Sequence, residues 1–132
     1  MQKYITPPIY YLNGLPHIGH AYTSILGDVM KKFEQMRGNG VYYTTGTDEH
    51  GQKIENCAAE AGISPKQYVD GVAGEIKAIW DLMDTSYSKF IRTTDADHEA
   101  QVQKIFKRLY DQGDIYKGYY EGMYCTPCES FF

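Results

Sequence analysis

Apolar and polar residues recur along the chain in patterns that predict helices separated by short strands. From residue 18 the apolar positions have helical spacing, and Gly38 is a plausible residue to end this helix. Residues 3–6 and 41–45 are rich in β-branched and aromatic side chains, which predicts strands. Residues 7–16 carry prolines and an Asn-Gly pair, which predict a loop. The apolar positions of the first helix are Ile18, Tyr22, Ile25, Leu26, Val29, Met30, Phe33 and Met36.

The remainder of the chain continues this alternation. Residues 52–61 predict a second helix, and Ser64 followed by Pro65 predicts the start of a third. Residues 90–92 predict a strand, residues 94–97 begin a fourth helix that ends at Gly113, and residues 115–124 resemble a β-hairpin. The third helix presents an apolar face of Val69, Val72, Ile76, Ile79, Trp80 and Met83, and the fourth is expected to bury Val102, Ile105, Phe106 and Leu109. This order predicts an α/β fold with a parallel sheet covered by helices.

Two polar clusters, at residues 13–20 and 45–51, lie where predicted strands end. In parallel α/β sheets, ligands bind beyond the carboxyl ends of the strands. We therefore expect both clusters to contribute to one shared site.

The first cluster contains His17 and His20, which are three residues apart at the predicted first turn of a helix. At this spacing both side chains can point to one face, beside backbone N–H groups that attract phosphate. Two imidazoles there can donate hydrogen bonds to phosphate oxygens whose charge grows during transfer, and Gly19 would let a flat ring approach the backbone. Two alternatives remain: one histidine caps the helix and the other is on the surface, or both bind zinc together with His50 and Asp48.

The second cluster places Asp48 in the loop at the end of a predicted strand, followed by Glu49, His50 and Gly51. A carboxylate at a strand end can bind a cationic group such as an α-ammonium. For a lone acidic residue, a helix cap or a solvated position is the more common role. Two acids, a histidine and nearby glycines in one strand-end loop favour a binding site.

A third motif, Cys125-x-x-Cys128, has the spacing of two zinc ligands on a knuckle turn. It supplies only half of a zinc site, because no Cys or His follows in the last four residues. A pair of thiols without metal is the alternative. The odd count of three cysteines and the absence of any sign of secretion predict a reducing, cytoplasmic location.

Composition limits the class of protein. The 132 residues are 42% hydrophobic and 23% charged, which is typical of one globular domain and argues against disorder. Thirteen basic and 17 acidic residues give a net charge of −4, which argues against broad, charge-driven binding of nucleic acid. The sequence contains no signal peptide and no apolar run of the length that spans a bilayer, so no membrane partner is expected.

Together these motifs resemble one family. Residues 6–23, TPPIYYLNGLPHIGHAYT, resemble the opening of methionyl-tRNA synthetases and contain the HIGH-type motif of class I aminoacyl-tRNA synthetases. Residues 45–51, TGTDEHG, are similar to the family's second signature, and residues 90–94 and 124–128 also fit. The HIGH-type motif alone is shared by many synthetases and nucleotidyltransferases, whereas its combination with GTDEHG favours methionine over leucine, isoleucine, valine or cysteine.

The resemblance implies a fold, a reaction and roles for the matching residues. The fold would be the first half of a Rossmann-like parallel-sheet nucleotide-binding domain over residues 1–113, with the start of a zinc-knuckle connective insertion over residues 114–132. The reaction would activate methionine with ATP, accompanied by Mg²⁺, and transfer it to tRNA(Met). The implied methionine-binding residues are Pro8, Ile9, Tyr11 and Asp48. The implied ATP-binding residues are Tyr11, Asn13, His17, Gly19 and His20, of which His17 and His20 would be catalytic. Cys125 and Cys128 would be the first two zinc ligands.

The family's lysine signature, the second half of the nucleotide fold and the remaining zinc ligands are absent from the sequence. We therefore expect a fragment that is inactive alone, binds zinc weakly or not at all, and can associate with itself. Two other functions remain as alternatives: a non-catalytic binder of methionine or nucleotide, and a nucleotidyltransferase that shares the HIGH-type motif.

Overall fold

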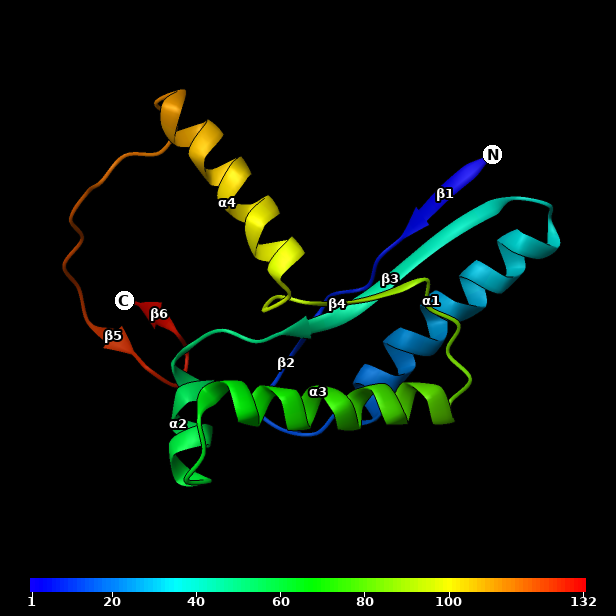
Figure 1. The fold of residues 1–132 in the computed structure, drawn as a ribbon, viewed down its shortest axis with the longest axis horizontal. Helices are drawn as coiled ribbons and strands as arrows, with labels where there is room; N and C mark the ends of the chain where they lie inside the picture. The colour runs from blue at the N-terminus through cyan, green and yellow to red at the C-terminus, as the bar shows by residue number, and fades with distance from the viewer. The chain divides into compact units, whose positions relative to one another are not determined.

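The computed structural model describes residues 1–132. Residues 1–93 form a first compact unit, built on a parallel sheet whose central strand is β3 (Gly40–Asp48) (Figure 1). β1 (Gln2–Ile5) pairs with the first half of β3, and β2 (Tyr10–Tyr11) pairs with its end. β4 (Lys89–Arg92) also runs parallel to β3, opposite residues 44–47. The predicted α/β class with a parallel sheet is confirmed.

β2 lies within the segment predicted to be a loop, so that prediction was wrong at residues 10–11. Ile5 pairs with Tyr43, and Tyr10 pairs with Thr47. Four residues, 6–9, therefore lie opposite three residues of β3, 44–46. The extra residue falls at the two prolines, which have no N–H for the ladder and interrupt it. Because the pairing resumes after the prolines, Tyr10 and Tyr11 lie beside the end of β3.

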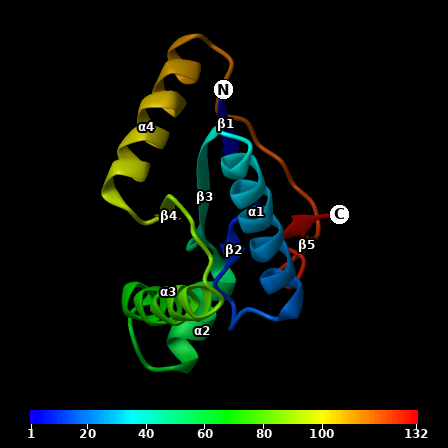
Figure 2. The same cartoon turned by 90° about the vertical axis from the view of Figure 1, so that its right-hand side faces the viewer.

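α1 (Ile18–Met36) runs alongside β3 (Figure 2) and ends as predicted, with Gly38 in the left-handed conformation at φ 78°. Its buried residues are Ser24, Gly27, Asp28 and Lys31, whereas the eight apolar positions of the predicted face are exposed. The face of α1 with small side chains is buried because it lies close to the ring of Tyr43. A Cβ added to Gly27 would lie 2.9 Å from the Tyr43 hydroxyl. The Tyr43 hydroxyl also donates to the carbonyl oxygen of Ser24 at 3.0 Å.

α2 (Gln52–Glu60) and α3 (Pro65–Leu82) complete the first unit and carry most of its apolar core. Ser64 and Gln67 form the capping box that begins α3, as the Ser-Pro pair predicts. The predicted face of α3 is confirmed: Val69, Ile76 and Trp80 are buried, and Val72, Ile79 and Met83 pack against them. Tyr10 and Leu12 join this core, so the segment around β2 is anchored in it.

Residues 94–132 form a second compact unit. It contains α4 (Ala96–Asp111) and a small antiparallel hairpin of β5 (Tyr124–Cys125) and β6 (Ser130–Phe131). The predicted helix is confirmed, but its predicted burial is wrong, because α4 has no buried residue. The predicted hairpin at residues 115–124 is also wrong, because residues 112–123 form no strand and the hairpin lies further on, around the two cysteines. No helix combines the length and apolar character needed to cross a membrane.

Candidate functional site

The end of β3 and the start of α1 come together through the tyrosines of β2. Tyr11 pairs in register with Asp48, and the backbone N–H of Leu12 donates to the Asp48 carbonyl oxygen at 3.3 Å. The Tyr10 side chain contacts the start of α1, where its ring forms a T-shaped pair with the His20 ring, with centroids 5.0 Å apart. Its hydroxyl lies 2.7 Å from Ser24 Oγ and donates to the His20 carbonyl oxygen at 3.3 Å. The two polar clusters thus flank one strand end.

His17 and His20 form a reciprocal capping box at the N-terminus of α1. The Nδ1 of His17 accepts from the N–H of Gly19 at 3.0 Å, and the Nδ1 of His20 accepts from the N–H of His17 at 3.2 Å. Since both Nδ1 atoms accept, each neutral ring carries its proton on Nε2, which is then a donor. The rings are stacked with centroids 3.8 Å apart. Both histidines therefore take part in the cap, whereas the capping alternative expected only one to do so, and each Nε2–H is left as a donor at the helix N-terminus.

Two further features bear on this pair: the pKa of His20 and the small size of Gly19. Burial, followed by the nearby His17, lowers the pKa of His20 below the ordinary value of 6.5, so this ring is neutral at pH 7. Gly19 leaves room for the cap, because an added Cβ would lie 2.9 Å from Cε1 of His17. The arrangement can therefore donate hydrogen bonds to an anion without itself needing a proton from solution.

Asp48 ends β3 and is half-buried, and its carboxylate makes no hydrogen bond or ion pair within the chain. Its neighbour Glu49 behaves differently. The Glu49 side chain is fully buried. Arg92 binds its carboxylate through two contacts, Nε to Oε1 at 2.7 Å and Nη2 to Oε2 at 2.9 Å. Two adjacent acids therefore have opposite roles: one is neutralised in the protein and the other is available to a cation from outside.

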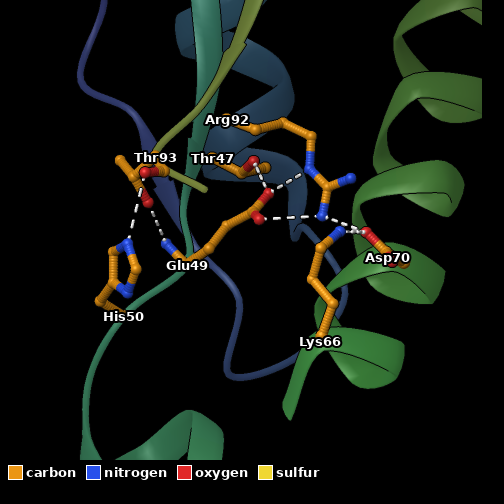
Figure 3. Close-up of polar contacts among 7 residues, drawn as sticks. All are labelled: Thr47, Glu49, His50, Lys66, Asp70, Arg92 and Thr93. Atoms are coloured by element: carbon orange, nitrogen blue, oxygen red, sulfur yellow. Dashed lines mark hydrogen bonds and ion pairs between the residues drawn. The ribbon is translucent and has the colours of Figure 1, made fainter. Parts of the chain in front are cut away.

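The Glu49–Arg92 pair is the centre of a larger network at the ends of β3 and β4 (Figure 3). The Thr47 hydroxyl donates to Glu49 at 2.5 Å, and Arg92 also contacts Asp70 of α3 at 2.6 Å. These hydrogen bonds, that with Glu49 foremost, raise the pKa of Arg92 above its ordinary range. Sequence reasoning missed this pair, because the residues are 43 positions apart and only the β3–β4 register brings them together.

Comparison with known proteins identifies the family. The family described as tRNA synthetases class I (M) matches residues 3–132. The chain belongs to this family. A methionine–tRNA ligase of Caldanaerobacter subterraneus subsp. tengcongensis is 61% identical over 129 residues, which are 98% of this chain and 20% of that protein. A methionine–tRNA ligase of Helicobacter pylori strain J99 is 51% identical over 132 residues. The chain thus spans about a fifth of the length of the curated relatives it matches.

Solved synthetase structures agree in fold. Methionyl-tRNA synthetase of Mycobacterium tuberculosis, bound by methionyl-adenylate, matches with a TM-score of 0.95 and 36% identity, covering 100% of this chain and 26% of that one. LeuRS of Agrobacterium radiobacter K84, in a ternary complex with tRNA and LeuAMS, matches with a TM-score of 0.79 and 28% identity over 86% of this chain and 15% of that one. The fold of this synthetase chain is that of the catalytic Rossmann-like domain.

The other residues implied by the synthetase resemblance lie around this strand end. Tyr11 is half-buried, with Lys53 Nζ 5.9 Å from its ring centroid. Pro8 and Ile9 precede β2 in the bulge and are exposed, as is Asn13 in the loop before α1. Their assignment to methionine and ATP stays a prediction.

Metal binding in this synthetase chain has one candidate place. Cys125 ends β5 and Cys128 lies on the turn that leads to β6, and the N–H of Cys128 donates to Cys125 Sγ at 3.3 Å. Two thiolates held in this way suit half of a tetrahedral zinc site. Nowhere in residues 1–132 do three His, Cys, Asp or Glu side chains gather to hold a metal ion. This argues against the zinc alternative for His17, His20, His50 and Asp48, and His50 Nε2 instead lies 3.3 Å from the Thr93 carbonyl oxygen.

Proposed function

We propose that the protein containing this chain activates methionine with ATP and transfers the methionyl group to tRNA(Met). The observation that carries the proposal is the unpaired carboxylate of Asp48 at the end of β3. β2 pairs with this strand end, and the two histidine donors follow β2 at the start of α1. The similarity to methionine–tRNA ligases and to a synthetase solved with methionyl-adenylate supports methionine and ATP as the substrates.

The geometry suggests how the substrates are used. The Asp48 carboxylate binds the methionine ammonium, with Tyr11, Pro8 and Ile9 beside it. A methionine carboxylate oxygen attacks the α-phosphorus of ATP, and the bond from that phosphorus to the bridging oxygen breaks as pyrophosphate leaves. The Nε2–H groups of His17 and His20 stabilise the negative charge that develops on the phosphate oxygens.

Further residues and ions complete the proposal. Asn13 and Gly19 contact ATP together with Tyr11, and Mg²⁺ accompanies ATP as part of the substrate. Cys125 and Cys128 supply two of four ligands to Zn²⁺, and the other two ligands come from outside residues 1–132. The three free cysteines support a cytoplasmic location.

Pyrophosphate exchange tests the proposal. The protein containing this chain is assayed with ATP and a panel of amino acids, and methionine is expected to drive exchange best. Exchange driven best by leucine, valine or cysteine would contradict the assignment. Isothermal titration with methionine and with ATP separates the alternative of a non-catalytic binder, for which binding occurs without exchange.

A further inference from the structure

Thr93 contacts the backbone on both sides of Asp48, and Figure 3 shows its contacts with Glu49 and His50. Its N–H donates to the Thr47 carbonyl oxygen at 3.2 Å, and its hydroxyl oxygen accepts from the Glu49 N–H at 2.8 Å. Its carbonyl oxygen lies 3.3 Å from the Nε2 of His50. On the opposite edge of β3, Leu12 binds the carbonyl oxygen of Asp48 itself. The backbone that carries the Asp48 side chain is therefore held from both neighbouring strands.

The buried ion pair adds a second constraint on the same turn. The buried Glu49 follows Asp48 and binds Arg92 of β4. Arg92 in turn binds Asp70 of α3, so the end of β3 is connected to both elements. Arg92 pairs in register with Thr47, the residue before Asp48. Because successive side chains of a strand point to opposite faces, Arg92 lies with Thr47 and away from Asp48. The carboxylates of Glu49 and Asp70 hold the guanidinium on that face, so Arg92 does not pair with Asp48.

We infer that Thr93 and the Glu49–Arg92 ion pair are positioning residues for Asp48, holding the end of β3 and keeping the Asp48 carboxylate free for the substrate ammonium. This inference rests on the proposed function, because it takes Asp48 to be the ammonium site. It assigns no contact with substrate to Thr93, Glu49 or Arg92. Their effect on methionine must therefore pass through Asp48.

A double-mutant cycle in the protein containing this chain tests the inference. Thr93→Val removes the hydroxyl acceptor at nearly constant volume, and we expect methionine affinity to fall about three- to tenfold, the range for one lost hydrogen bond. Titration calorimetry with methionine and with ATP should show that ATP affinity is unchanged. Thr93→Ser keeps the hydroxyl and should restore methionine affinity. Lys66→Ala removes an exposed member of the same network and serves as the matched control, with methionine affinity as in the unmodified protein.

The decisive measurement combines each variant with Asp48→Asn. If Thr93 acts through Asp48, Thr93→Val should cause no further loss of methionine affinity in the Asp48→Asn background. Glu49→Gln weakens the ion pair with Arg92 and should behave in the same way, which provides a second variant if Thr93→Val unfolds. An equal loss with and without Asp48, or an unchanged affinity in Thr93→Val, would overturn the inference. If Asp48→Asn alone leaves methionine affinity unchanged, the assignment of Asp48 in the proposed function is what fails.

Discussion

Replacement of His20 separates its two roles, in the helix cap and in catalysis. The Nδ1 of His20 accepts from the His17 N–H at 3.2 Å, and its Nε2–H is left as a donor. His20→Ala removes both functions, so we expect a loss of about 1 kcal/mol in the free energy of unfolding, as for other cap residues. The adenylation rate should fall roughly 100- to 1000-fold, the effect of deleting one donor to a developing oxyanion.

His20→Gln is the matched variant, because glutamine at the third helical position also closes a capping box. Its side-chain oxygen can accept from the His17 N–H, while its amide does not place a donor where the imidazole Nε2 lies. We therefore expect the stability of His20→Gln to be close to that of the unmodified protein, with a rate as low as that of His20→Ala. The difference between the two variants isolates the cap.

Methionine-dependent pyrophosphate exchange at varied ATP, together with urea unfolding, measures both effects. The expected result is a fall in kcat that greatly exceeds any rise in the KM for ATP, since the hydrogen bond strengthens only in the transition state. A raised KM with unchanged kcat would show that His20 contributes only to ground-state binding. A fully active His20→Gln would show that His20 acts only as a cap.

Four further predictions follow from individual contacts. Asp48→Asn should weaken methionine binding by about one to two orders of magnitude, the range for a lost charge-assisted hydrogen bond, and calorimetry that detects no change would mark Asp48 as structural. Gly46→Ala should destabilise the protein by roughly 2–3 kcal/mol in urea unfolding, because a Cβ would overlap the carbonyl oxygen of Ile91 in β4. Burial raises the pKa of Asp28, but hydrogen bonds from Lys32 and Ser86 outweigh burial and hold that pKa below 3.8. The contribution of Asp28 to stability is therefore full above about pH 4 and is lost as the pH falls further. Asp28→Asn should remove this dependence of stability on acid. Residues 1–132 as an isolated polypeptide should self-associate through the exposed apolar face of α1, and a monomer in sedimentation velocity at high concentration would contradict this.

The sequence by itself predicted the elements whose signals are local. Ser64 followed by Pro65 begins α3, and Gly38 ends α1, because a cap needs only backbone groups within a few residues. The apolar face of α3 was predicted correctly for a similar reason, since its spacing follows from helix geometry. The position of Asp48 at a strand end, and of the histidine pair at a helix start, also followed from local order.

Tertiary structure decided which surfaces are buried and which polar groups are neutralised. α1 turns Ser24 and Gly27 to the sheet and its apolar face outward, because the ring of Tyr43 leaves no room for larger side chains. Glu49 and Asp48 are adjacent acids with the same local signals, yet only Glu49 meets Arg92, which the β3–β4 register brings from 43 residues away. A carboxylate is either a structural ion-pair partner or a free binding group according to whether the fold places a cation beside it. The sequence around the carboxylate does not contain that cation, so only the packed structure distinguishes the two.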